Sequence, residues 1–167
     1  MSSPPDILIR SFRVYELETL HQLMHDTIRT VAVGLYTPAQ AAVWAPDPES
    51  AAWRLQALRL RTSLMQSVSL VAEAEDRIIG FGNITPAGYL DYLYVHREAV
   101  RQGVGSRLLD ALEDVARHAG AAEMTAHASF LLRPLLERRG FAVRERREMV
   151  VAGVTLVNFD MAKSLCG

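Results

Sequence analysis

Apolar positions along this chain switch between two spacings, the alternation typical of strands and the three-to-four-residue repeat typical of amphipathic helices. Alternation predicts a first strand over Ile7 to Phe12. Helical spacing predicts a long helix over about Glu16 to Val33, in which the apolar positions are Leu17, Leu20, Met24, Ile28 and Val31. This apolar stripe is expected to face the core.

Two further helices are marked by the residues that begin them. Thr37 and Pro38 are typical of an N-cap and a first helical residue, and they predict a helix that ends at Trp44. Another helix is expected over Ser50 to Arg61. Strand spacing then returns, and the predicted strands are Val68 to Ala72, Ile78 to Ile84 and Tyr89 to Val95.

The last third of the chain predicts a helix, a strand, a second helix and a hairpin. These elements are a helix from Val104 to about Gly120, a strand over Glu123 to Ala128, a helix over Phe130 to Arg139 capped by Ser129, and strands over Phe141 to Val151 and Val154 to Ala162. A strand, helix, strand crossover makes its two strands parallel. The predicted fold class is therefore α+β, with a mixed, mainly antiparallel sheet flanked by helices.

A glycine turn between Val95 and the helix that follows carries the clearest chemical signal. Gly103 and Gly105 lack side chains at the positive end of the predicted helix, where backbone N–H groups converge on anions. Glycines also serve merely to turn a corner. The dinucleotide-binding motif requires a third glycine where this chain has Leu108, and no Lys-Ser or Lys-Thr follows to make a nucleoside-triphosphate loop. The turn therefore predicts a site for a different phosphorylated cofactor.

The segment from Val95 to Leu109 resembles the core motif of the GNAT superfamily of N-acetyltransferases. In that motif a strand ending in Val is followed by Gln or Arg, two residues, Gly, one residue, and Gly or Ala. This chain departs from the motif at Val100, where the family usually has Gln or Arg. The run from Glu137 to Phe141 is similar to the family's late helix ending in Gly-Phe. The resemblance implies acetyl-CoA as cofactor, and a sheet in which the two parallel strands splay apart around its pantetheine arm.

The resemblance also implies which residues hold acetyl-CoA. Backbone at the end of the central strand, at Leu93, Tyr94 and Val95, is expected to contact the pantetheine and the thioester. The phosphate-binding amides fall on Arg101, Gln102, Gly103, Val104, Gly105 and Ser106. Many relatives carry a tyrosine as general acid where this chain has Leu136, and Asn where it has Ser129. The general acid is therefore expected to be another tyrosine, a water or the solvent.

Asp91 and His127 are the candidate bases that deprotonate the acceptor amine. Asp91 lies inside an apolar strand, on the face expected for Leu93 and Val95, and burial there would raise the pKa of its carboxyl toward a useful value. The alternative is a solvated residue on a half-exposed strand. His127 is expected to be exposed toward the thioester by the splay of its strand.

The acceptor pocket is expected between the early helices and the last strand. The run from Tyr36 to Gln40, with Trp44, resembles a stretch in a bacterial GNAT subgroup. Tyr36 is assigned to the pocket and Trp44 to the core, although aromatic residues in such segments often serve packing. Asn158 in the last strand is expected to add a polar group. The acceptor itself is predicted only as a small-molecule or peptide primary amine.

Composition limits the remaining functions. The 167 residues predict one domain over 1–167, and half of them are hydrophobic. With 18 basic and 19 acidic side chains, the net charge of −1 favours neither a nucleic acid nor an anionic membrane as partner. Arginines between Arg133 and Arg147 are interleaved with acidic residues, which is typical of a solvated face or of a rim for CoA phosphates.

The cysteine count and the absence of a long apolar run bear on location. Cys166 is the one cysteine and predicts a reducing compartment, and no Cys/His cluster indicates a metal site. No apolar run, near the N-terminus or elsewhere, approaches the roughly 20 residues that span a bilayer. A cytoplasmic protein, monomeric or homodimeric, is expected. Its predicted function is direct acetyl transfer to an amine in a ternary complex, and the alternative is a noncatalytic acyl-CoA sensor.

Overall fold

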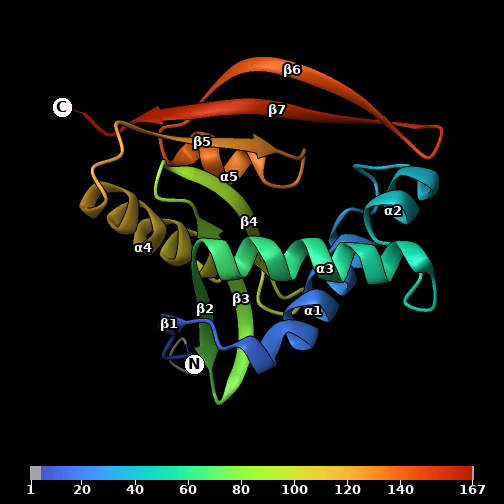
Figure 1. Cartoon of the computed structure of the whole chain (residues 1–167), viewed down its shortest axis with the longest axis horizontal. Helices are drawn as coiled ribbons and strands as arrows, with labels where there is room; N and C mark the ends of the chain where they lie inside the picture. The colour runs from blue at the N-terminus through green and yellow to red at the C-terminus, as the bar shows by residue number, and fades with distance from the viewer. Residues whose placement is uncertain (1–4, 167) are drawn as a thin grey trace.

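The computed structural model describes residues 5–166, so residues 1–4, which belong to the segment considered for a leader, lie outside it. Its elements are β1 (Leu8–Ser11), a 3₁₀ turn (Val14–Glu16), α1 (Leu17–Val31), α2 (Pro38–Trp44), α3 (Ala51–Gln66), β2 (Val68–Ala74), β3 (Arg77–Ile84), β4 (Tyr89–Val95), α4 (Val104–His118), β5 (Glu123–Ala128), α5 (Arg133–Arg138), β6 (Ala142–Val151) and β7 (Val154–Ser164) (Figure 1).

A seven-stranded sheet in the order β1-β2-β3-β4-β5-β7-β6 forms the centre of the fold. All neighbouring strands are antiparallel except β4 and β5, which are parallel. The predicted mixed, mainly antiparallel sheet is confirmed. The final hairpin is inverted relative to chain order, because β7 lies beside β5 and leaves β6 at the edge.

The parallel strands β4 and β5 are paired only at the beginning of β4, which lies against the middle of β5. Their register joins Tyr89 to Thr125 and Leu90 to Ala126, and no further pair follows among the described residues. By contrast, β5 pairs along its whole length with β7, from Glu123 to Ala128. The carboxyl ends of β4 and β5 therefore separate, as the family resemblance implied.

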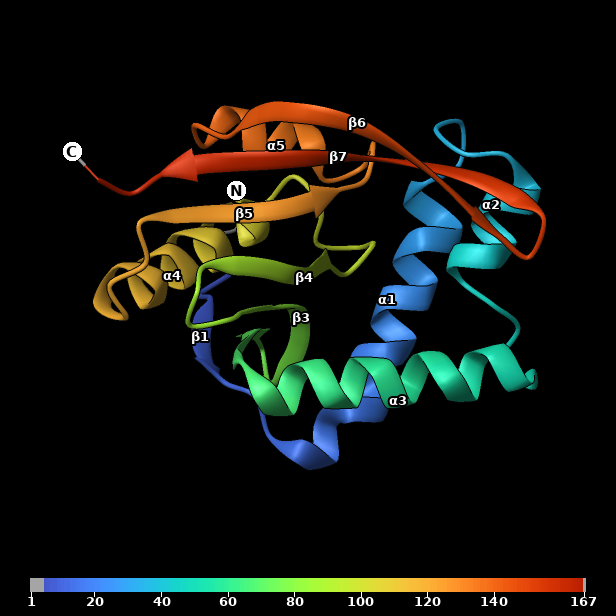
Figure 2. The same ribbon diagram turned by 45° about the horizontal axis from the view of Figure 1, so that its top comes forward.

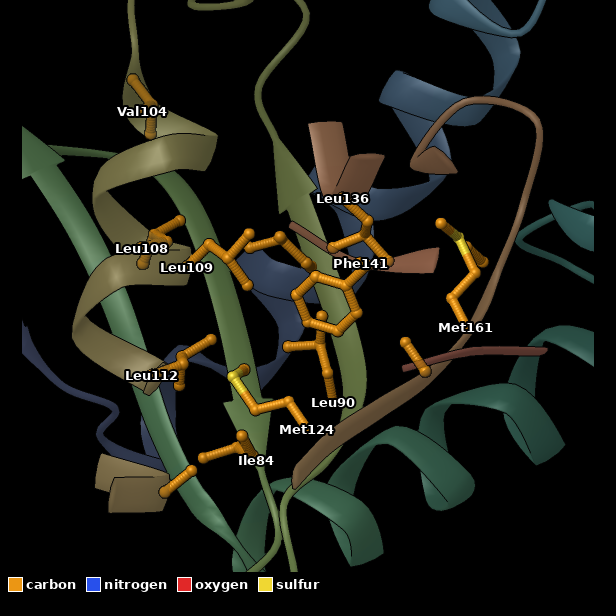
Figure 3. Close-up of a cluster of buried hydrophobic side chains, with 14 of the residues drawn as sticks. Ile84, Leu90, Val104, Leu108, Leu109, Leu112, Met124, Leu136, Phe141 and Met161 are labelled. Atoms are coloured by element: carbon orange, nitrogen blue, oxygen red, sulfur yellow. The ribbon is translucent and has the colours of Figure 1, made fainter. Parts of the chain in front are cut away.

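Helices cover both faces of the sheet (Figure 2). On one face α4 packs Leu108, Leu109 and Leu112 against strand residues such as Ile84, Leu90 and Met124, as Figure 3 shows. On the other face, α1 and α3 enclose Phe81 together with Leu20 and Leu60. Burying side chains of this size stabilises the fold by about 1.5–3 kcal/mol each. Two cores thus hold the sheet rigid around the separating strands.

Two predicted helix boundaries are wrong for local reasons. The helix predicted to end at Arg61 continues to Gln66, since Leu60 and Leu64 are buried one turn apart on either side of polar Thr62 and Ser63. The helix predicted over Phe130 to Arg139 is shortened to α5. The Ser129 hydroxyl does accept a hydrogen bond from the Leu132 amide at 3.2 Å, but it caps only the turn before α5.

The β6–β7 hairpin is long enough to reach the helices at the far end of the sheet. Both views place the tip of the hairpin beside α2 (Figures 1 and 2). Gln40 of α2 donates a hydrogen bond from Nε2 to the Thr155 carbonyl oxygen at 3.0 Å. The hairpin and α2 therefore close one end of the space that opens between β4 and β5.

Candidate active site

The loop from β4 to α4 presents a row of free backbone N–H groups. Arg101 and Gly103 both have left-handed backbone conformations, with φ of +66° and +79°. None of the amides of residues 101–106 has a hydrogen-bond acceptor within residues 5–166. These amides lie at the positive end of the 15-residue helix α4. The loop therefore has the donors and the dipole of an anion site.

The two glycines of this loop have different physical roles. Gly103 needs its positive φ, and a Cβ there would meet nothing within 4 Å. At Gly105 a Cβ would lie 3.0 Å from Leu135 Cδ2 and 3.5 Å from Val95 Cγ2. The expectation that both glycines clear space for a ligand is corrected here, because protein atoms fill the space beside Gly105.

A cavity of about 890 Å³ joins this loop to the hairpin and to the helices α1 and α2. The predicted site residues that line it are Tyr36, Asp91, Leu93, Tyr94, Val95, Arg101, Gly103, Val104, Gly105, Ser106, His127 and Asn158. Gln102 does not line the cavity, and its side chain donates instead to the Glu98 carbonyl oxygen at 3.3 Å. One cavity thus collects the cofactor, base and acceptor residues predicted from separate parts of the sequence.

Asp91 lies where a β-bulge interrupts β4. Ile84 is opposite Leu90 and Asn83 is opposite Tyr92, so Asp91 is the extra residue. Asp91 is exposed, which overturns the burial on which its expected pKa shift depended. Its carboxylate accepts a hydrogen bond from the hydroxyl of Ser63 in α3, so it does not share the face of Leu93 as simple alternation predicted. It still lines the cavity.

A buried asparagine holds this bulge in place. Asn83 is 0% exposed, and its Oδ1 accepts the hydrogen bond of the Tyr92 amide at 2.9 Å. Its Nδ2 donates to the hydroxyls of Ser63 and Ser67, each at 2.7 Å. Because the Ser63 oxygen accepts from Asn83, its own proton is directed to Asp91. The role of Asn83 could not be predicted from the sequence, since nothing in the pattern of β3 or β4 marks a bulge.

His127 lies on the separated end of β5, as predicted, and is exposed to the cavity. Its Nδ1 is 3.4 Å from the Tyr89 hydroxyl. Burial, and after it the positive charge of Arg147, lowers the pKa of the His127 imidazole below 6.5. The ring is therefore mainly neutral at pH 7 and has a nitrogen lone pair that can accept a proton.

Two tyrosines, Tyr36 and Tyr94, line the cavity, and hydrogen bonds hold their hydroxyls in place. The Tyr36 hydroxyl accepts a hydrogen bond from the Phe130 amide at 2.8 Å, and the Tyr94 hydroxyl accepts one from Trp44 Nε1 at 3.1 Å. Burial raises the pKa of both phenols, so both stay protonated at neutral pH. Leu136, which replaces the usual tyrosine, is 0% exposed in the core and contributes no polar group.

The cavity has further lining residues. Thr27 of α1 donates from Oγ1 to the Val95 carbonyl oxygen at 2.9 Å and so fixes the end of β4. Arg138 of α5 also lines the cavity, and it belongs to the run of arginines predicted as a solvated face or a rim for CoA phosphates. Trp44, assigned to the core, both packs against the second core and lines the cavity. Thr27 could not be predicted, because a threonine inside a helix carries no pattern that distinguishes such a role.

Two other kinds of feature are absent from residues 5–166. No group of three or more His, Cys, Asp or Glu side chains there is placed to hold a metal ion. No helix in the same range combines the length and apolar character needed to cross a bilayer.

Comparison with known proteins identifies the family. Residues 35–165 match the family model described as an acetyltransferase (GNAT) domain. The chain belongs to the GNAT family. This GNAT protein is 28% identical over 156 residues, 93% of its own length and 95% of the relative's, to the uncharacterized N-acetyltransferase YafP of Escherichia coli K12. The family and the acyltransferase class predicted from the sequence are confirmed.

Solved structures of other GNAT proteins share this fold. A GCN5-related N-acetyltransferase from Rhodopseudomonas palustris has a TM-score of 0.86 at 25% identity, over 99% of this chain and 98% of that one. The PaiA N-acetyltransferase from Thermoplasma acidophilum, solved with coenzyme A, has a TM-score of 0.70 at 22% identity, over 95% and 99% of the two chains. A putative acetyltransferase from Salmonella typhimurium, YncA, was solved with acetyl-CoA and has a TM-score of 0.69 at 19% identity, over 97% and 95%. These complexes agree with the predicted cofactor.

Proposed function

We propose that this GNAT protein is an acetyl-CoA-dependent N-acetyltransferase that transfers the acetyl group directly to a primary amine. The observation that carries this proposal is the continuous cavity, which runs from the free amides of residues 101–106 to the hairpin, where Asn158 lines it. Both substrates of a direct transfer must occupy one space at the same time. We also propose that residues 1–167 act as one acetyltransferase domain and that it works in the cytoplasm.

The residues of the cavity fit the chemistry of acetyl-CoA. The amides of residues 101–106 would bind its pyrophosphate, and the cavity-lining guanidinium groups of Arg101 and Arg138 would add positive charge at the same end. The edge of β4 at Leu93 to Val95, which faces away from β3 and is unpaired with β5, would hold the pantetheine. When bound there, acetyl-CoA supplies an activated acetyl thioester.

Asp91 and His127 are proposed to receive the proton that the acceptor amine must lose. Both line the cavity, Asp91 directly after the last residue of β4 that pairs with β5, and His127 near the carboxyl end of β5. His127 is mainly neutral at pH 7, and Asp91 has its carboxylate oriented by the Ser63 hydroxyl. The Tyr36 phenol, protonated and held by the Phe130 amide, is proposed to donate the proton that the departing thiol needs.

Calorimetry with acetyl-CoA, combined with an assay of CoA-thiol release against a panel of amines, tests the proposal. Binding and amine-dependent release are expected. Gly103→Leu is expected to weaken acetyl-CoA binding, because its side chain would enter the space beside the free amides. Gly120→Leu is the matched control, since Gly120 has a φ of +80°, also has no atom within 4 Å of a Cβ, and does not line the cavity.

The possible outcomes separate the two functions that the sequence left open. Binding without release from any amine would favour the acyl-CoA sensor over the enzyme. Equal acetyl-CoA affinity in Gly103→Leu, Gly120→Leu and the unaltered protein would refute the assignment of the phosphates to the glycine loop.

A further inference from the structure

The acceptor end of the cavity is formed by one face of the β6–β7 hairpin. Arg147 is opposite Asn158, and Met149 is opposite Leu156. Paired residues of antiparallel strands point to the same face, as do residues two apart on one strand. Asn158, Met149 and Leu156 all line the cavity. Arg147 is not a lining residue, but it lies on the same face of the hairpin, directly across from Asn158.

Arg147 and Asn158 both carry buried polar atoms that lack a partner within residues 5–166. These atoms are Arg147 Nη1 and Asn158 Oδ1. Four neighbouring arginines differ, since they are paired with carboxylates, in the pairs Arg133–Glu137, Arg139–Asp110, Arg144–Glu123 and Arg146–Glu148. A buried guanidinium nitrogen without an acceptor is costly. A ligand that supplies the acceptor removes this cost.

The charge of Arg147 acts directly on the candidate catalytic residues. After burial, it is the next cause of the lowered pKa of His127, and it also lowers the pKa of Tyr89 against the raising effect of burial. The nearby carboxylates of Asp91 and Asp160 act on the His127 pKa in the opposite direction. The strand pairing agrees, because His127 is opposite Asp160, and Asn158, two residues before Asp160 on β7, is opposite Arg147. His127, Asn158 and Arg147 therefore lie on one face of three neighbouring strands.

We propose that Arg147 and Asn158 form a subsite for a carboxylate-bearing amine, of which free amino acids are the simplest members. The guanidinium donates two parallel hydrogen bonds to the carboxylate, and Asn158 Oδ1 accepts an N–H of the same molecule. The acceptor amine is then directed toward His127 and Asp91. This inference rests on the proposed function, because it names the substrate class of that acetyltransferase.

The test compares amines that differ only in the carboxylate. A panel of amino acids and the corresponding amino-acid amides is assayed for CoA-thiol release, and the same compounds are titrated by calorimetry into the CoA-saturated protein. We expect amino acids to exceed their amides by about tenfold or more in kcat/KM and in affinity. Arg147→Gln is expected to remove this preference by lowering the values for amino acids, while those for amides change by less than about threefold.

Two matched variants show whether the charge and geometry of Arg147 are responsible. Arg147→Lys keeps the charge and is expected to retain part of the preference. Arg146→Gln, at the adjacent position opposite Phe159, alters an exposed arginine on the other face and is expected to change nothing. Asn158→Leu is expected to weaken binding of amino acids and amides alike, since both offer an N–H.

The two readouts distinguish failure of the subsite from failure of the enzyme. Thiol release without a preference for the carboxylate, or a preference that survives in Arg147→Gln, overturns the subsite and leaves the acetyltransferase intact. Binding that depends on the carboxylate and on Arg147, without thiol release from any amine, supports the subsite and contradicts the proposed function. Absence of binding by every amino acid overturns the subsite.

Discussion

Replacing Asn83 with alanine is expected to lower the free energy of unfolding by about 2–5 kcal/mol. The side chain is fully buried and makes three hydrogen bonds, one accepted from the Tyr92 amide and two donated to the serine hydroxyls. Loss of the acceptor leaves the Tyr92 amide unsatisfied, which costs about 1–3 kcal/mol. The two hydroxyls lie in half-buried surroundings, so the lost bonds add about 0.5–1 kcal/mol each.

Urea unfolding of the purified protein measures this loss, with Ser67→Ala as the control. Ser67→Ala removes one of the same bonds, together with the bond that the Ser67 hydroxyl donates to the Ser63 carbonyl oxygen. It leaves the Tyr92 amide paired, so a smaller loss of about 1–2 kcal/mol is expected. An Asn83→Ala protein as stable as Ser67→Ala would refute the reasoning. It would mean that the bulge does not depend on a side-chain acceptor.

The remaining predictions concern the catalytic residues and the turn before β4. If His127 is the base, kcat/KM should fall with decreasing pH only below about 6.5, because the lowered pKa keeps the imidazole neutral above that value. Arg147→Gln removes a positive charge that lowers this pKa, so the fall in kcat/KM should begin at a higher pH. Rates measured between about pH 5 and pH 8 decide this. Asp91→Asn and His127→Ala should each reduce turnover at saturating amine, and if neither does, neither residue is the base. Tyr36→Phe should lower kcat about a hundredfold with little change in the KM for acetyl-CoA, whereas an unchanged kcat excludes this phenol as the acid. Gly88→Ala should destabilise the protein by about 3 kcal/mol or more in urea, because its Cβ would lie 2.1 Å from the Glu123 carbonyl oxygen at a φ of +96°.

Local spacing was sufficient to predict most elements, because a buried face repeats its period in the sequence. The stripe of α1 and the strand, turn and helix from Tyr89 to Gly120 are examples. The stripe of α3 was cut short by Thr62 and Ser63, since polar residues end an apolar pattern even where the helix continues. Residue periodicity also cannot show that β7 lies between β5 and β6, which depends on contacts distant in the chain.

The candidate site also has parts that could be predicted from the sequence and parts that could not. The glycine loop could be predicted because its function depends on backbone conformation, which Gly103 marks directly. The environment of Asp91 could not be predicted, because the extra residue in β4 places Asp91 on a different face of the sheet and leaves it exposed. Asn83, which holds that bulge, lies on another strand. Arg147 was placed in an ordinary charged run, since its lack of a partner exists only once the strands are paired.

The narrow contact between β4 and β5 also sets how the protein is expected to unfold. Two register pairs join the block β1-β2-β3-β4 to the block β5-β7-β6, whereas pairing within each block is extensive. Cooperative units of unfolding commonly follow such boundaries. Amide hydrogens of β5, β6 and β7 should exchange as a group, at a free energy below that of global unfolding. A ligand that contacts both blocks makes them one cooperative unit, so its binding should slow exchange far from the cavity, in strands it never touches.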